Sequence, residues 1–193
     1  MTRTLLLTFL LMLFCSVVSA AGTIQGKISG ASGQSVVYID AIAGKNFPAP
    51  SQPKVIDQRK LAFDPHITVV QVGTTVDFQN DDSTQHNVFW PSIGGNKKEG
   101  HNLGTWPKGE KRSFKFDQAG VVPLLCNVHT EMAGYVVVSP TPYFALTDPS
   151  GTFTIDNVPD GNYRLVAWHE GKKQQSKAVN ASGTTNIDFD LAN

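Results

Sequence analysis

Residues 126–132 read CNVHTEM, and this heptapeptide decides how the rest of the chain is interpreted. It places Cys126, His129 and Met132 at C-x2-H-x2-M spacing between two short apolar runs. Apolar runs of this length, bounded by Gly, Asn and Pro, are typical of β-strands. The sequence therefore predicts a short loop between two strands that carries a thiol, an imidazole and a thioether.

A second histidine stands upstream in the run 86–89, HNVF, soon after a strand-like run that ends at Asn80. His86 completes a set of one thiolate, two imidazoles and one thioether. This set suits copper in both oxidation states, because Cu(I) favours sulfur ligands and Cu(II) accepts nitrogen. A lone Cys is more often a small buried apolar residue, and zinc is an alternative ion for which Met is a poor ligand. The spacing and the flanking strands favour a copper site.

These motifs resemble the cupredoxin family of blue copper proteins, which includes plastocyanin, pseudoazurin and amicyanin. The run 73–89 is similar to the family's first-ligand region, a strand ending in Phe-x-Asn followed by His-Asn-Val. The loop at residues 126–132 is similar to that of amicyanin. The resemblance implies a Greek-key β-sandwich over residues 54–139 that holds one type 1 copper ion.

The resemblance also implies the role of each site residue. Asn87 would direct its backbone N–H at the Cys126 sulfur, and its side chain would tie the two ligand segments together. The implied copper ligands are His86, Cys126, His129 and Met132.

The remainder of the chain after residue 20 also reads as β-structure. Short runs rich in Val, Ile, Thr, Phe and Tyr alternate with clusters of Gly, Pro, Asn and Asp, and no stretch keeps a helical apolar period. The region 92–109 is rich in Gly, Lys and Asn and is expected to be a long loop. The expected fold class is all-β.

The segments on either side of residues 54–139 resemble a carboxypeptidase-regulatory-like, or transthyretin-like, β-sandwich. Residues 22–43 contain two expected strands, and residues 143–191 contain the turns DPSG at 148–151 and PDG at 159–161. Each segment alone has too few strands to bury a face. We therefore expect one split sandwich with the cupredoxin inserted, and the alternative is that residues 22–43 belong to the cupredoxin.

Residues 1–20 have the features of a secretory signal peptide. Arg3 precedes an apolar run that is too short to span a bilayer, and small residues end the segment at Ala20. A membrane anchor and a lipoprotein attached at Cys15 are the alternatives. Cleavage would leave Cys126 as the one cysteine of an exported chain, a lone thiol that a metal bond would protect. We expect a periplasmic protein with no membrane span after signal cleavage.

Charge and motif content narrow the range of functions that the sequence favours. The chain has 16 basic and 16 acidic residues, which gives no basic stripe for nucleic acid. The resemblance implies a one-electron carrier between periplasmic redox proteins such as a c-type cytochrome and a dehydrogenase. A copper-binding or delivery protein is the alternative, although Met-rich and His-rich tracts are absent from the sequence. An enzyme is not expected, because the His-x-His pairs of multicopper oxidases are also absent.

The sequence also predicts where electrons pass. A loop that joins two strands lies at one end of a sandwich. The resemblance to the cupredoxins implies that the ring of His129 reaches the surface there, among the small or apolar neighbours Val128, Ala133 and Gly134. Burial of this loop by the second sandwich is the alternative. The other histidines and tryptophans are interpreted as structural or solvated residues: His66, His101, His169, Trp90 and Trp106.

Overall fold

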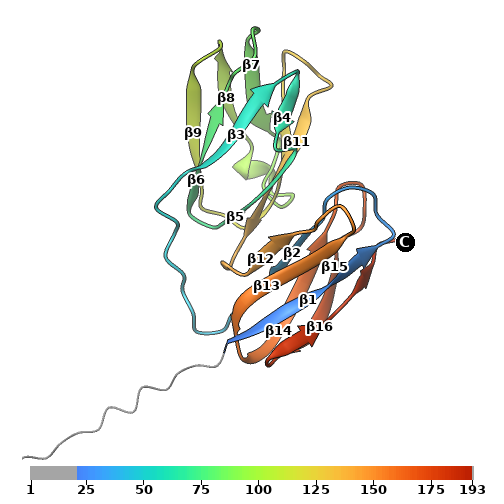
Figure 1. Ribbon diagram of the computed structural model, residues 1–193. Coiled ribbons are helices and arrows are strands. Elements are labelled where there is room, and N and C mark those ends of the chain that lie inside the picture. Colours follow the sequence, from blue (N-terminus) through green and yellow to red (C-terminus); the bar gives the residue numbers. More distant parts are fainter. Residues whose placement is uncertain (1–20, 193) are drawn as a thin grey trace, which may run out of the picture.

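Strands dominate the computed structural model, which describes residues 21–192 (Figure 1). The helical segment of this range is the single 3-10 turn η1 (Lys97–Glu99). The predicted fold class, an all-β chain of two sandwiches, is confirmed. The predicted signal peptide, residues 1–20 with Cys15, lies outside the described residues.

The central sandwich, residues 54–139, consists of two packed sheets. Its five-stranded sheet has the order β5 (Ile67–Gln71), β11 (Ala133–Ser139), β10 (Gly120–Leu125), β7 (His86–Trp90) and β8 (His101–Trp106). Its four-stranded sheet has the order β4 (Ala62–Asp64), β3 (Lys54–Arg59), β6 (Thr74–Gln79) and β9 (Lys111–Phe116). Strands β10 and β11 run antiparallel, so the loop between them closes one end of the sandwich.

The core of the central sandwich forms because alternate side chains of each strand face the opposite sheet. On β10, Val122 and Leu124 are buried while their neighbours are partly exposed. Trp90 and Trp106 are fully buried in this core, in agreement with their interpretation as structural residues. A dense aromatic core makes the sandwich a rigid support for the loops at its end.

The flanking sandwich is made of strands from both ends of the described chain. One sheet places β1 (Ala21–Ser29) between β13 (Thr152–Pro159) and β16 (Thr184–Asn186), with β17 (Phe189–Asp190) also paired to β1. The other has the order β12 (Phe144–Leu146), β2 (Val36–Ile39), β14 (Gly161–Trp168) and β15 (Gln175–Ala181).

The pairings of the first two strands decide how the chain is divided. Ile24 of β1 pairs with Ile155, and Val37 of β2 pairs with Ala167. Both strands thus pair with segments that follow the central sandwich, and Figure 1 shows them beside the late strands. On these pairings we propose one split unit, residues 22–43 and 143–191, with residues 54–139 inserted.

The expectation of a long loop over residues 92–109 is wrong in part. Strand β8 occupies residues 101–106 and pairs antiparallel with β7. β8 is the edge strand of its sheet, and of its residues only Trp106 is buried. A strand exposed on both sides lacks the apolar alternation that makes strands visible in a sequence.

The two sandwiches meet through an apolar cluster between two sheet faces. Trp168 and Val166 of β14 pack with Ile67 of β5 and Val137 of β11. This contact covers the face of the β5–β11–β10 sheet. Figure 1 shows the flanking sandwich below the central sandwich.

Candidate metal centre

The loop between β10 and β11 carries the first group of candidate ligands. Leu125 pairs with Ala133, so residues 126–132 span the gap between two adjacent strands. The Met132 N–H donates to the His129 carbonyl at 3.0 Å and tightens the end of the loop. The side chains of Cys126 and Met132 are buried in the apolar core of the central sandwich.

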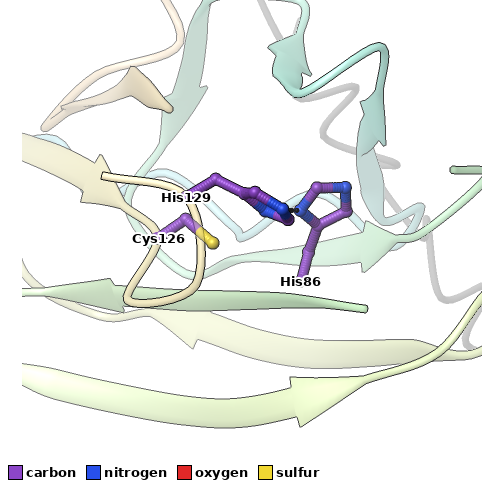
Figure 2. A group of neighbouring side chains, drawn as sticks. All are labelled: His86, Cys126 and His129. Atoms are coloured by element: carbon purple, nitrogen blue, oxygen red, sulfur yellow. Dashed lines mark hydrogen bonds between the residues drawn. The ribbon is translucent and has the colours of Figure 1, made fainter. Parts of the chain in front are cut away.

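His86 reaches the same place from the neighbouring strand. β7 pairs antiparallel with β10 through Phe89 and Leu125, which sets the first residue of β7 beside the loop. His86 is fully buried, whereas His129 is partly exposed. Figure 2 shows Cys126 and the two imidazoles pointing toward one another.

The distances within this group fit one metal ion. The Nδ1 atoms of His86 and His129 lie 3.0 Å apart, and the candidate ligand atoms of His86, Cys126 and His129 all lie within 4.8 Å of one another. Two nitrogens bound at about 2 Å to one ion are separated by about 3 Å. Two imidazole nitrogens and one thiolate are the strong donors of a type 1 copper site. The residues present therefore fit copper.

Asn87 connects the two ligand segments. Its backbone N–H points at the Cys126 Sγ at 3.4 Å, and its Oδ1 accepts from the Asn127 N–H at 3.3 Å. Its Nδ2 donates to the Asn102 Oδ1 and the Gly104 carbonyl at 2.8 and 2.7 Å. Such partners orient the ligands and tune their basicity. β8 supplies two of these contacts, so the region expected to be a loop supports the site.

Asp82 is a site residue that the sequence analysis missed. Its Oδ2 lies 2.9 Å from the His86 Nε2, the nitrogen that faces away from His129. A carboxylate at this position fixes the tautomer and the orientation of a ligating imidazole. An Asp four residues before a His has no distinctive sequence pattern, because the contact depends on how the 80–86 loop folds back.

The hairpin tip between β3 and β4 holds Asp82 in turn. The Lys60 and Leu61 N–H groups donate to its carboxylate at 2.7 and 2.9 Å. Burial works to raise the pKa of the Asp82 carboxyl, but its hydrogen bonds to Leu61, His86 and Lys60 outweigh that effect and lower the pKa. Asp82 therefore stays ionised beside His86.

This hairpin tip presents an apolar side chain to solvent. Lys60 and Leu61 both adopt positive φ, 54° and 57°, which costs free energy for non-glycine residues. Leu61 is 44% exposed, and Val128 of the ligand loop is 47% exposed. The Leu61 backbone and the His86 ring both contact the Asp82 carboxylate. Val128 directly precedes His129 in the chain.

The other histidines lie outside the metal group found in residues 21–192. The His101 ring packs in a tilted arrangement against Trp90 and Phe114, with ring centroids 5.4 and 4.9 Å apart. His169 is buried and its Nε2 lies 2.9 Å from the Ser32 carbonyl. His66 contacts the backbone of Ala133 and a side chain of the flanking sandwich.

Two protein families match the chain. Residues 52–139 match the copper binding proteins of the plastocyanin/azurin family, and residues 132–192 match the carboxypeptidase regulatory-like domain. The resemblance to both families is confirmed. Copper is accordingly the cofactor of the central sandwich, and the His-Cys-His group fits a type 1 copper site.

Solved structures similar to this chain include variants of amicyanin. A reduced tryptophan-to-tyrosine variant is 26% identical, with a TM-score of 0.43, and the match covers 47% of this chain and 86% of that one. An oxidised proline-to-alanine variant is 28% identical, with a TM-score of 0.42, covering 45% and 82%. No curated protein matches the chain. Within residues 21–192, no helix combines the length and the apolar character needed to cross a membrane.

Proposed function

We propose that this chain is a type 1 copper protein that carries single electrons between redox partners in the periplasm. Its four copper ligands would be His86, Cys126, His129 and Met132. The observation that carries the proposal is the 3.0 Å approach of two Nδ1 atoms beside a buried cysteine. When bound, copper supplies the Cu(II)/Cu(I) couple.

The residues around the site favour electron transfer because hydrogen bonds from neighbouring residues hold them in place. Asp82 fixes the His86 ring, and Asn87 links the Cys126 sulfur to the ligand loop. A site whose ligands change little between oxidation states has a small reorganisation cost. Four protein ligands also leave no open position for a substrate, so we propose a carrier rather than an enzyme.

Burial of the site distinguishes a carrier from a delivery protein. Cys126 and His86 have almost no contact with solvent, and Met132 is equally buried. A protein that hands copper to a partner needs ligands that the partner can reach. The buried set supports retention of the ion and use of its redox couple.

The partner would dock on the exposed end of the ligand loop. Asn127, Val128, Thr130, Glu131 and Ala133 are exposed, so the flanking sandwich does not bury this loop. Val128 offers apolar contact area beside His129, and Leu61 does so near His86. Thr130 and Glu131 would form part of a polar rim. A small surface of this kind fits the transient complexes of redox proteins such as a c-type cytochrome or a dehydrogenase.

The periplasmic location rests on the sequence of residues 1–20, whose features are those of a secretory signal peptide. An exported chain with one cysteine keeps its thiol protected if that thiol is bound to copper.

Titration of the purified mature protein with Cu(II) tests the proposal. We expect one equivalent of copper to give an intense absorption toward the red end of the visible spectrum, from thiolate-to-copper charge transfer. The reduced protein should then transfer one electron to an oxidised c-type cytochrome in stopped-flow mixing. A pale, tetragonal Cu(II) complex would rule out type 1 ligation, and a blue protein that exchanges no electron would refute the carrier role.

A further inference from the structure

The interface between the two sandwiches extends to the edge of the ligand loop. Tyr135 of β11 packs on Trp168 of β14, with ring centroids 5.1 Å apart. His66, just before β5, lies edge-on to Tyr135 at 5.8 Å. Tyr135 is only two residues beyond Ala133, where the ligand loop ends and β11 begins.

His66 bonds to both sandwiches at once. Its Nδ1 lies 3.1 Å from the Ala133 carbonyl, and its Nε2 lies 2.7 Å from the Glu170 Oε2 in the loop after β14. The backbone carbonyl and the carboxylate are both hydrogen-bond acceptors, and they lie at opposite nitrogens of the ring. One imidazole thus joins the flanking sandwich to the residue that follows Met132.

The backbone near His66 is also tied to the start of β11. The Tyr135 N–H donates to the His66 carbonyl at 2.8 Å. At Gly134 an added Cβ would lie 3.1 Å from the same carbonyl oxygen, so a larger residue there would crowd His66. Movement of His66 would therefore be transmitted directly to the first residues of β11.

We propose that Glu170 of the flanking sandwich is a positioning residue for the copper-ligand loop, acting through His66 on Ala133. The flanking sandwich thereby sets the environment of Met132 and the reduction potential of the site. This inference deepens the proposed copper function and rests on it.

Removal of the Glu170 carboxylate is expected to affect the ligand loop and not the stability of the whole protein. The side chains of His66 and Glu170 are 47% and 39% exposed, and ion pairs this exposed contribute little to global stability. The Glu170→Ala variant should therefore unfold at nearly the same temperature as the parent. Its effect should appear in the ligand loop, which a merely structural surface residue would leave unchanged.

Hydrogen exchange in the copper-free protein tests the coupling without relying on the metal. Glu170→Ala should increase the exchange rate of the Met132 amide, which bonds to the His129 carbonyl. His66→Phe, which keeps a ring against Tyr135, should produce the same increase. Lys172→Ala in the same loop should not. Parent-like exchange of Met132 in both Glu170→Ala and His66→Phe would overturn the proposal.

The copper-loaded protein supplies the second readout. Glu170→Ala and His66→Phe should each shift the reduction potential and the charge-transfer spectrum, and the double variant should shift them no further, because both remove one connection. Glu131→Gln serves as a charge control beside Met132. It should shift the potential while leaving the spectrum unchanged.

Failure of the positioning role and failure of the proposed copper function give different results. Additive shifts in the double variant, or equal changes in Glu131→Gln and Glu170→Ala, would show a simple charge effect and overturn the positioning role. A parent protein that forms no blue site would refute the proposed copper function, and the exchange rates of Met132 would still decide the coupling.

Discussion

The two histidines of the candidate centre are held in opposite ways. His86 begins a β-strand, is fully buried, and has an Asp82 carboxylate behind its Nε2. His129 lies in a seven-residue loop and is partly exposed, among exposed residues. The first ring is fixed by the sandwich, whereas the second borders solvent.

Under the proposed function, this difference would separate two tasks within one site. A buried imidazole with a carboxylate partner fixes the metal position and raises ligand basicity. An imidazole at the surface brings the edge of the site within reach of another protein. Variants that affect one histidine but not the other can therefore test the division.

Removal of the thiolate should have the largest effect, because the thiolate is the strong sulfur ligand of a type 1 copper site. Cys126→Ala should abolish the intense visible absorption of the Cu(II) protein while leaving the far-ultraviolet circular dichroism of the sandwiches unchanged. An intense blue band in Cys126→Ala would show that the thiolate is supplied elsewhere.

Loss of the carboxylate that holds His86 should have the second-largest effect. Asp82→Ala removes the carboxylate behind His86 and should weaken copper affinity by about 10- to 100-fold, the usual cost of losing such a partner. Competition with a chelator measures this affinity. Asp81→Ala is the matched control, since Asp81 is exposed and its side chain only approaches Arg59 at 3.9 Å. Equal affinities for the two variants would contradict the role of Asp82.

Replacement of the thioether should change the potential more than the affinity. Met132→Gln should retain a copper site with an altered reduction potential, because the axial position accepts either donor and tunes the couple. Protein-film voltammetry measures the potential. Copper loss as complete as that of Cys126→Ala would show that Met132 is not a weak axial ligand.

Alteration of the exposed histidine's surroundings should have the smallest effect on the site. Val128→Lys should slow electron exchange with a partner cytochrome and leave the blue spectrum nearly intact. Val55→Lys is the matched control, because Val55 is 42% exposed but lies on β3, where it pairs with Asp77. Unchanged exchange rates in Val128→Lys would place the docking surface elsewhere.

The sequence was sufficient to predict the all-β fold, because the core strands alternate visibly between apolar and polar residues. Its ligand assignment rests on distinctive residue types and spacing, and the structure brings Cys126 together with His86 and His129. Strand β8 was missed because it lies at a sheet edge with little buried surface. Asp82 and the His66–Glu170 pair were missed because they depend on chain segments that meet only after folding.

The chain leaves the flanking sandwich after β2 and returns to it before β12, and the two crossing points are bonded together. The Thr141 hydroxyl donates to the Ile39 carbonyl at 2.8 Å, and the Ile39 N–H donates to the Tyr143 carbonyl at 2.9 Å. The segment between these two points contains the whole central sandwich. While that segment is unfolded, bringing its ends together carries an entropic cost that slows folding. If the central sandwich folds first, it brings these ends together and shortens the effective loop. The central sandwich would then bring together the two parts of the sandwich that surrounds it in sequence, so the order in which the two sandwiches fold would be set by the insertion.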